Sequence, residues 1–154
     1  MRKIPLALWL ALCPTLAQAQ EKTPAAAFSF IQSNMGDGSW TGESEHCDKN
    51  FDNCSAEYGF KITSVSYYNN NYCFISMTMA TEYTPYQVIR RIDLTKSIQI
   101  TASYSALYFD GPITNSRGNT YRGWTAAPPS YAINERVRKA FEYLQSVCKP
   151  ASAF

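Results

Sequence analysis

The sequence has few of the residues and motifs on which most enzyme classes depend. His46 is the only histidine in 154 residues, so any histidine-dependent zinc site or Ser-His-Asp arrangement would have to use it. No Gly-x-Ser-x-Gly or His-Glu-x-x-His motif accompanies it. The seven glycines form neither a phosphate-binding loop nor a dinucleotide fingerprint. The sequence therefore predicts no catalytic residues, no metal and no cofactor, and we expect a protein that is not an enzyme.

Long hydrophobic runs are also missing. The mostly apolar run Ile4–Leu12 is well short of the roughly 20 residues that a membrane span needs. It follows the cationic start Met1–Lys3 and precedes the small-x-small site Ala17–Ala19. This order is typical of a secretory signal peptide. We expect residues 1–19 to be removed by cleavage after Ala19, which predicts a periplasmic or secreted protein with no transmembrane segment in its mature chain.

A lipid anchor at Cys13 is disfavoured by its neighbours. Leu10–Cys13 can be read as a lipoprotein motif, but Leu12 is bulky where a small residue is expected. Pro14 follows the cysteine directly.

The predicted mature chain has no excess of charge of either sign. The full chain has 14 Lys+Arg and 12 Asp+Glu, and loss of Arg2 and Lys3 leaves 12 of each. Nothing in this balance favours nucleic acid as a partner. The distribution is uneven, because acids dominate between Asp37 and Glu57 and bases dominate from Arg90 onward. A polarised surface for a charged partner and ordinary surface pairing both fit this pattern.

Periodicity predicts an α+β single domain over residues 20–154, with an antiparallel β-meander of about five strands, an N-terminal helix and a C-terminal helix packed on the sheet. A polar loop is expected over residues 36–57, with at most a short strand near Trp40. A turn is expected at Asp110-Gly111-Pro112. The expected strands are Tyr58–Tyr68, Tyr72–Glu82, Gln87–Leu94, Ser97–Phe109 and Asn119–Thr125, the first two joined by a hairpin turn at Asn69–Asn71.

Two helices follow from capping residues and apolar stripes. Thr23-Pro24 opens the first, which buries Phe28, Ile31 and Met35 and stops at Gly36. Asn134 is expected to cap the second, which runs to about Cys148 before Pro150. Its apolar stripe consists of Val137, Phe141, Leu144 and Cys148.

Four cysteines remain after cleavage, and they predict two structural disulfides. Cys47 and Cys54 lie in one short segment, so a local bridge is easy to close. Cys73 shares the inward face of its strand with Ile75, and Cys148 points inward from the last helix. A Cys73–Cys148 bond would join that helix to the sheet. With no Cys-x-x-Cys present, we expect these cysteines to be structural and not redox-active.

Two weaker chemistries remain as alternatives. Glu43 and Glu45 would share one face of a strand, with their carboxylates about 6–7 Å apart, so they could serve a small cell-wall glycan hydrolase. The segment Asp48–Asn53 has oxygen donors like the start of a calcium loop. Asn53 replaces the required glycine of such a loop and Gly59 the bidentate glutamate, so calcium binding is not expected.

Eleven tyrosines, all in the mature chain, suggest a binding surface. Tyr and Trp contribute much of the energy at protein interfaces, although tyrosine is also common on half-buried sheets. The candidate binding residues on or beside strands are Tyr67, Tyr68, Arg90, Arg91, Tyr104, Tyr108, Arg122 and Trp124. The sequence thus predicts a small exported binding protein that meets a protein partner, as an inhibitor, an immunity-type protein or an envelope accessory protein. A carrier of a small apolar ligand inside the sheet is a further alternative.

Overall fold

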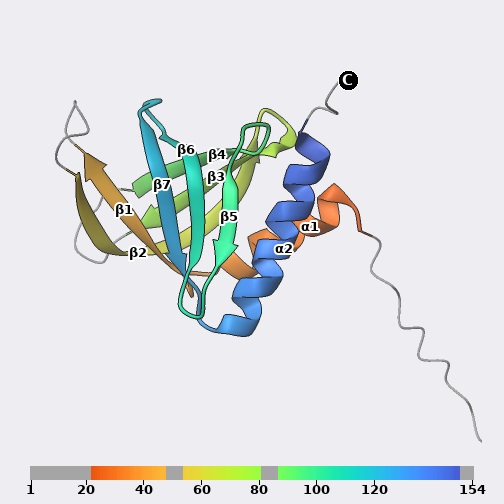
Figure 1. Ribbon diagram of the computed structural model, residues 1–154, viewed down its shortest axis with the longest axis horizontal. Coiled ribbons are helices and arrows are strands. Elements are labelled where there is room, and N and C mark those ends of the chain that lie inside the picture. The colour runs from red at the N-terminus through yellow and green to blue at the C-terminus, as the bar shows by residue number, and fades with distance from the viewer. Residues whose placement is uncertain (1–21, 48–53, 81–86, 150–154) are drawn as a thin grey trace, which may run out of the picture.

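The structure is a computed structural model that describes residues 22–47, 54–80 and 87–149. The predicted signal peptide, Cys13 and the calcium-like segment lie outside these ranges. Two helices and seven strands follow one another as α1, β1–β7 and α2, which confirms the predicted α+β class with more strands than expected (Figure 1). Their bounds are α1 Pro24–Met35, β1 Thr41–Cys47, β2 Cys54–Tyr68, β3 Asn71–Ala80, β4 Gln87–Asp93, β5 Gln99–Ala102, β6 Leu107–Asn115, β7 Thr120–Ala127 and α2 Tyr131–Cys148.

The antiparallel sheet closes on itself and leaves one strand outside the closed ring. Its order is β4-β3-β2-β1-β7-β6-β5, and β4 also pairs with β6. Along one side of β6, Leu107–Asp110 pairs with β5 and Ile113–Asn115 pairs with β4. The register shift between Asp110 and Ile113 separates the two pairings. Among the described strands, β5 alone has a single partner strand.

Two expectations about the strands were wrong. The polar stretch 36–57 contains β1 and the start of β2, because backbone pairing with neighbouring strands stabilises residues whose side chains show no apolar alternation. The predicted strand Ser97–Phe109 is two strands, since the chain turns at Ser103–Ala106 and folds back.

The predicted turn at Asp110–Pro112 is instead a bulge within β6. Gly111 has a φ of +147°, and a Cβ there would lie 3.0 Å from the Ser97 carbonyl oxygen, so glycine is needed for this close approach.

The hairpin between β2 and β3 confirms the predicted asparagine turn. Asn69 and Asn70 have φ values of 58° and 51°, in the left-handed region that asparagine tolerates best after glycine.

Each helix buries the face that its apolar spacing predicted. Thr23 caps α1 by accepting a hydrogen bond from the Ala26 amide at 3.1 Å. Helix α2 starts earlier than expected, with Ser130 at the cap position, and Asn134 lies inside the helix with its side chain buried. The predicted stripes are buried in full: Phe28, Ile31 and Met35 on α1, and Val137, Phe141, Leu144 and Cys148 on α2.

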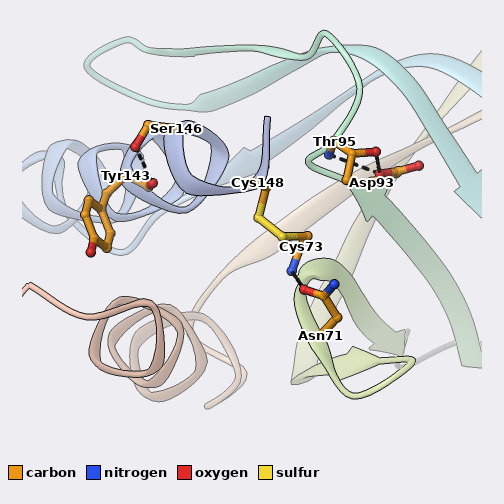
Figure 2. The surroundings of a disulfide bond; sticks show 7 residues. All are labelled: Asn71, Cys73, Asp93, Thr95, Tyr143, Ser146 and Cys148. Carbon is orange, nitrogen blue, oxygen red and sulfur yellow. Dashed lines mark hydrogen bonds between the residues drawn. A yellow bond between two sulfur atoms is a disulfide. The ribbon is translucent and has the colours of Figure 1, made fainter. Parts of the chain in front are cut away.

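The predicted bond between Cys73 and Cys148 is present. It joins the start of β3 to the end of α2 across 75 residues, with a Cα–Cα distance of 5.5 Å. Figure 2 shows the bond crossing from the last helical turn to the strand, where the Asn71 side chain accepts a hydrogen bond from the Cys73 amide at 2.9 Å. For the second predicted bridge, Cys47 and Cys54 are register partners in β1 and β2. Their side chains lie outside the described part, so that bridge stays a prediction.

Candidate functional site

Two of the predicted binding residues are buried and cannot form an exposed surface. Trp124 is 5 % exposed and Arg90 is 3 % exposed. Arg90 pairs with Met77 across β3 and β4, so it points inward, and its guanidinium lies 4.5 Å from the centre of the Tyr121 ring. The sequence indicated this placement, because Arg90 is two residues from each of the apolar residues Val88 and Ile92 and therefore shares their face of the strand. Cation–π contact with Tyr121 partly compensates the burial of the charge.

Three other predicted residues lie near the β2–β3 hairpin. Tyr67 packs edge-on against Phe28 of α1 at 5.0 Å, which ties it to the core. On the opposite face, Arg91 lies 5.3 Å from the centre of the Tyr68 ring. Burial raises the pKa of Tyr68, Asp93 raises it further, and Arg91 opposes both. These residues mainly stabilise the hairpin.

Tyr104 and Tyr108, two of the predicted binding residues, are both exposed. Tyr104 is 84 % exposed, at the tip of the turn between β5 and β6, and it stacks on Tyr131, the first residue of α2. The two ring centres are 5.6 Å apart with planes 18° from parallel. Tyr108 is exposed on β6, one residue after the start of that strand. We call Tyr104 and Tyr131 the tyrosine patch. Arg122 is also exposed, on β7.

A buried asparagine holds the turn that carries Tyr104. The side chain of Asn134 is fully buried and donates hydrogen bonds to the carbonyl oxygens of Ser103, at 2.8 Å, and Ala106, at 2.9 Å. Both ends of the turn are thereby attached to α2. An exposed aromatic ring on a fixed turn loses little conformational entropy when a partner binds.

Beside the patch, a groove of about 700 Å³ runs between β5 and α2. In Figure 1, β5 lies alongside α2. Alternate residues would line a groove over a sheet face, whereas consecutive residues line a groove along a strand edge. The groove wall from the strand side is the unbroken run 97–102, so the edge of β5 faces the groove. The helix contributes Glu135, Arg138, Glu142 and Gln145, followed by Lys149 beyond its end.

The hydrogen-bond pattern shows which backbone groups point into the groove. The Ser103 amide donates to the Ala106 carbonyl at 2.8 Å, so these residues form a hydrogen-bonded pair. Alternation along the antiparallel ladder directs the peptide groups of Thr101 toward β6 and those of Ile100 and Ala102 away from it. Ile98 lies two residues before Ile100, so its peptide groups also point away from β6. Its carbonyl accepts a hydrogen bond from the Gln145 side chain at 2.7 Å. The edge therefore presents strand donors and acceptors to the groove.

Charges on the helix wall of the groove largely neutralise one another. Arg138 forms ion pairs with Glu135, at 2.6 Å, and with Glu142. The hydrogen bond from Arg138 lowers the pKa of Glu135, and the hydrogen bond to Glu135 raises the pKa of Arg138. The groove is therefore polar with little net charge.

Three further observations concern metal binding, membrane spans and the paired glutamates. Within residues 22–47, 54–80 and 87–149, no group of three or more His, Cys, Asp or Glu side chains could hold a metal ion. Over the same ranges, no helix has the length and apolarity to cross a membrane. Glu43 and Glu45 lie on β1, but their side chains are outside the described part.

Comparison with known proteins gives no further guide: no family model matches the chain, and neither a curated protein nor a solved structure is detectably similar to it.

Proposed function

We propose that this chain is an exported, non-enzymatic binding protein that captures an extended segment of a partner protein along β5. The segment adds as a strand to the free edge of β5, and the tyrosine patch contacts its side chains at one end of the groove. Strand addition supplies affinity through backbone hydrogen bonds, while neighbouring side chains supply specificity. The predicted signal peptide and the Cys73–Cys148 bond support an oxidising, extracytoplasmic location.

The observation that carries the proposal is that no other described strand pairs with the outer edge of β5, whereas the remaining described strands form a closed ring. Exposed strand edges are templates for another strand, and proteins usually shorten or cover them. Here α2 stands across from the edge and leaves about 700 Å³ between them. A strand added to β5 would lie about 4.8 Å from it.

Proline substitutions test whether the edge is free. Ala102→Pro removes an amide that points into the groove, and we expect the free energy of unfolding to change by less than about 1 kcal/mol. Thr101→Pro removes an amide that bonds β6, and we expect a loss of about 2–3 kcal/mol. Urea unfolding of both variants measures the difference. Equal losses would mean that the assigned edge is wrong.

Selection from a displayed library of random dodecapeptides tests binding. We expect enriched peptides that bind the purified protein and slow the hydrogen exchange of the Ile100 and Ala102 amides. Ala102→Pro should abolish their binding without unfolding the protein. Failure to enrich any peptide, or enriched peptides that bind Ala102→Pro as tightly as the unaltered chain, would refute the proposal.

Tyr104→Ser tests the tyrosine patch. Because the ring is exposed, we expect the free energy of unfolding to change by less than about 0.5 kcal/mol. Peptide affinity should fall about tenfold or more, as for an aromatic anchor at an interface. Tyr67→Ser is the matched control, since Tyr67 is 41 % exposed but packs near α1, away from the groove. It should leave the affinity unchanged, and an equal loss in both variants would exclude a specific role for Tyr104.

A further inference from the structure

A second groove lies on the other flank of α2, where that helix packs on α1. Its volume is about 410 Å³, within the range of small-molecule sites. The lining is mainly apolar and comes from Ala26, Ala27 and Phe30 of α1 and from Ala140 and Tyr143 of α2. The Tyr143 hydroxyl donates to the Lys22 carbonyl at 2.5 Å and joins α2 to the segment that precedes α1. This groove is separate from the one beside β5.

Among the described residues, those at the rim of the second groove carry positive charge alone. Lys22, Arg136 and Lys139 line it, and all three are exposed. In the described part of the chain, none of the three forms an ion pair, while the guanidinium of Arg136 lies 4.8 Å from the centre of the Phe30 ring. Helix α1 has no charged residue, and the glutamates of α2 pair with Arg138 on its other flank. The ion pairs of α2 thus involve Arg138, whereas the cations beside the apolar groove form no ion pair with any described residue.

The dimensions favour an alkyl chain as the occupant. The groove volume of about 410 Å³ suits a small molecule, and the lining is mainly small apolar side chains with one phenylalanine ring. A single hydrocarbon chain is narrow enough to lie on the alanines and against Phe30. An anionic headgroup at the rim would then meet the three cations.

We propose that the groove between α1 and α2 binds a single-chain anionic amphiphile, with its alkyl chain on Ala26, Ala27 and Phe30 and its carboxylate or phosphate near Arg136 and Lys139. This site does not depend on the proposed strand addition at β5. Its charge complementarity predicts discrimination by headgroup, and its apolar floor predicts dependence on chain length.

Titration calorimetry with monomeric dodecanoate and dodecyl phosphate tests the site. Both should bind, whereas dodecyltrimethylammonium should not, and shortening the chain should weaken binding. Arg136→Gln with Lys139→Gln should weaken dodecanoate about tenfold or more, since two charge-assisted contacts are lost. Lys96→Gln with Arg117→Gln changes the net charge equally at exposed positions outside the groove and should have no effect. Ala26→Leu, which fills the floor, should also weaken binding.

Further ligands in the same experiment identify the source of the natural ligand and define the results that would refute the proposal. Preferential binding of lysophosphatidylglycerol over dodecanoate would assign the site to a lipid headgroup, and the reverse would assign it to free fatty acid. Equal affinity for inorganic phosphate and dodecyl phosphate would show that the site binds the anion and not the alkyl chain, and would refute the proposal. Binding that survives both the double charge variant and Ala26→Leu would refute it as well. Binding of an acidic amphipathic peptide in place of dodecanoate would do the same.

Discussion

Replacing Cys73 and Cys148 by alanine should lower the free energy of unfolding by about 4–5 kcal/mol, more than the loss of any buried hydrogen bond would cost. The bond closes a loop across 75 residues, and the chain-entropy relation gives this value for a loop of that size. Small domains have total stabilities of about 5–15 kcal/mol, so the variant would be close to unfolding at physiological temperature. Urea unfolding under oxidising conditions measures the loss.

A reductant provides the control for this prediction. It should destabilise the unaltered protein by at least this amount. In the double variant, which has no Cys73–Cys148 bond to lose, the reductant can remove only the contribution of the predicted Cys47–Cys54 bridge. A double variant that unfolds at the same urea concentration as the oxidised parent would contradict the assigned role of the bond.

Asn134→Leu should lower the free energy of unfolding by about 2–4 kcal/mol, because it removes the side-chain hydrogen bonds to the carbonyls of Ser103 and Ala106. Asn134→Asp should behave similarly, since an ionised carboxylate cannot donate. In both variants the turn that carries Tyr104 loses its attachment to α2, so its amides should exchange faster with solvent. Urea unfolding and hydrogen exchange measure the two effects.

Ser130→Ala is the matched control at the same end of α2. Ser130 occupies the cap position, yet its side chain makes no capping hydrogen bond. We expect a change of less than about 0.5 kcal/mol. If Ser130→Ala proved as costly as Asn134→Leu, the helix end would depend on its cap, and the assigned role of Asn134 would be wrong.

The sequence predicted correctly the features that are specified by residues close together in the chain. The stripes of α1 and α2 follow from helical spacing, and the Asn69–Asn70 turn follows from the left-handed preference of asparagine. The Cys73–Cys148 pairing could be predicted because each cysteine lies on a face whose direction the periodicity defines. These predictions needed no knowledge of distant contacts.

The features that sequence reasoning missed depend on contacts between distant segments. Strand β1 has a polar sequence, and its pairing with β2 and β7 cannot be read from its own residues. The alternation from Ile98 onward continues past the Ser103–Ala106 turn, which concealed the boundary between β5 and β6. In the candidate site, Tyr104 and Tyr108 were predicted from composition. The stacking of Tyr131 on Tyr104 and both grooves were missed, because they form only where α2 packs beside the β5–β6 turn, β5 and α1.

Closure of the sheet has a consequence for how fast the chain folds. The ring is completed by pairing Thr41 and Gly42 of β1 with Ala127 and Ala126 of β7, segments at nearly opposite ends of the described chain. Contacts between segments so distant in the sequence slow the search for the native state, and domains dominated by non-local strand pairing typically fold in milliseconds to seconds. Oxidation of Cys73 and Cys148 before the search ends would shorten the path between these segments. Refolding with the thiols blocked should therefore be slower than refolding with the bond intact.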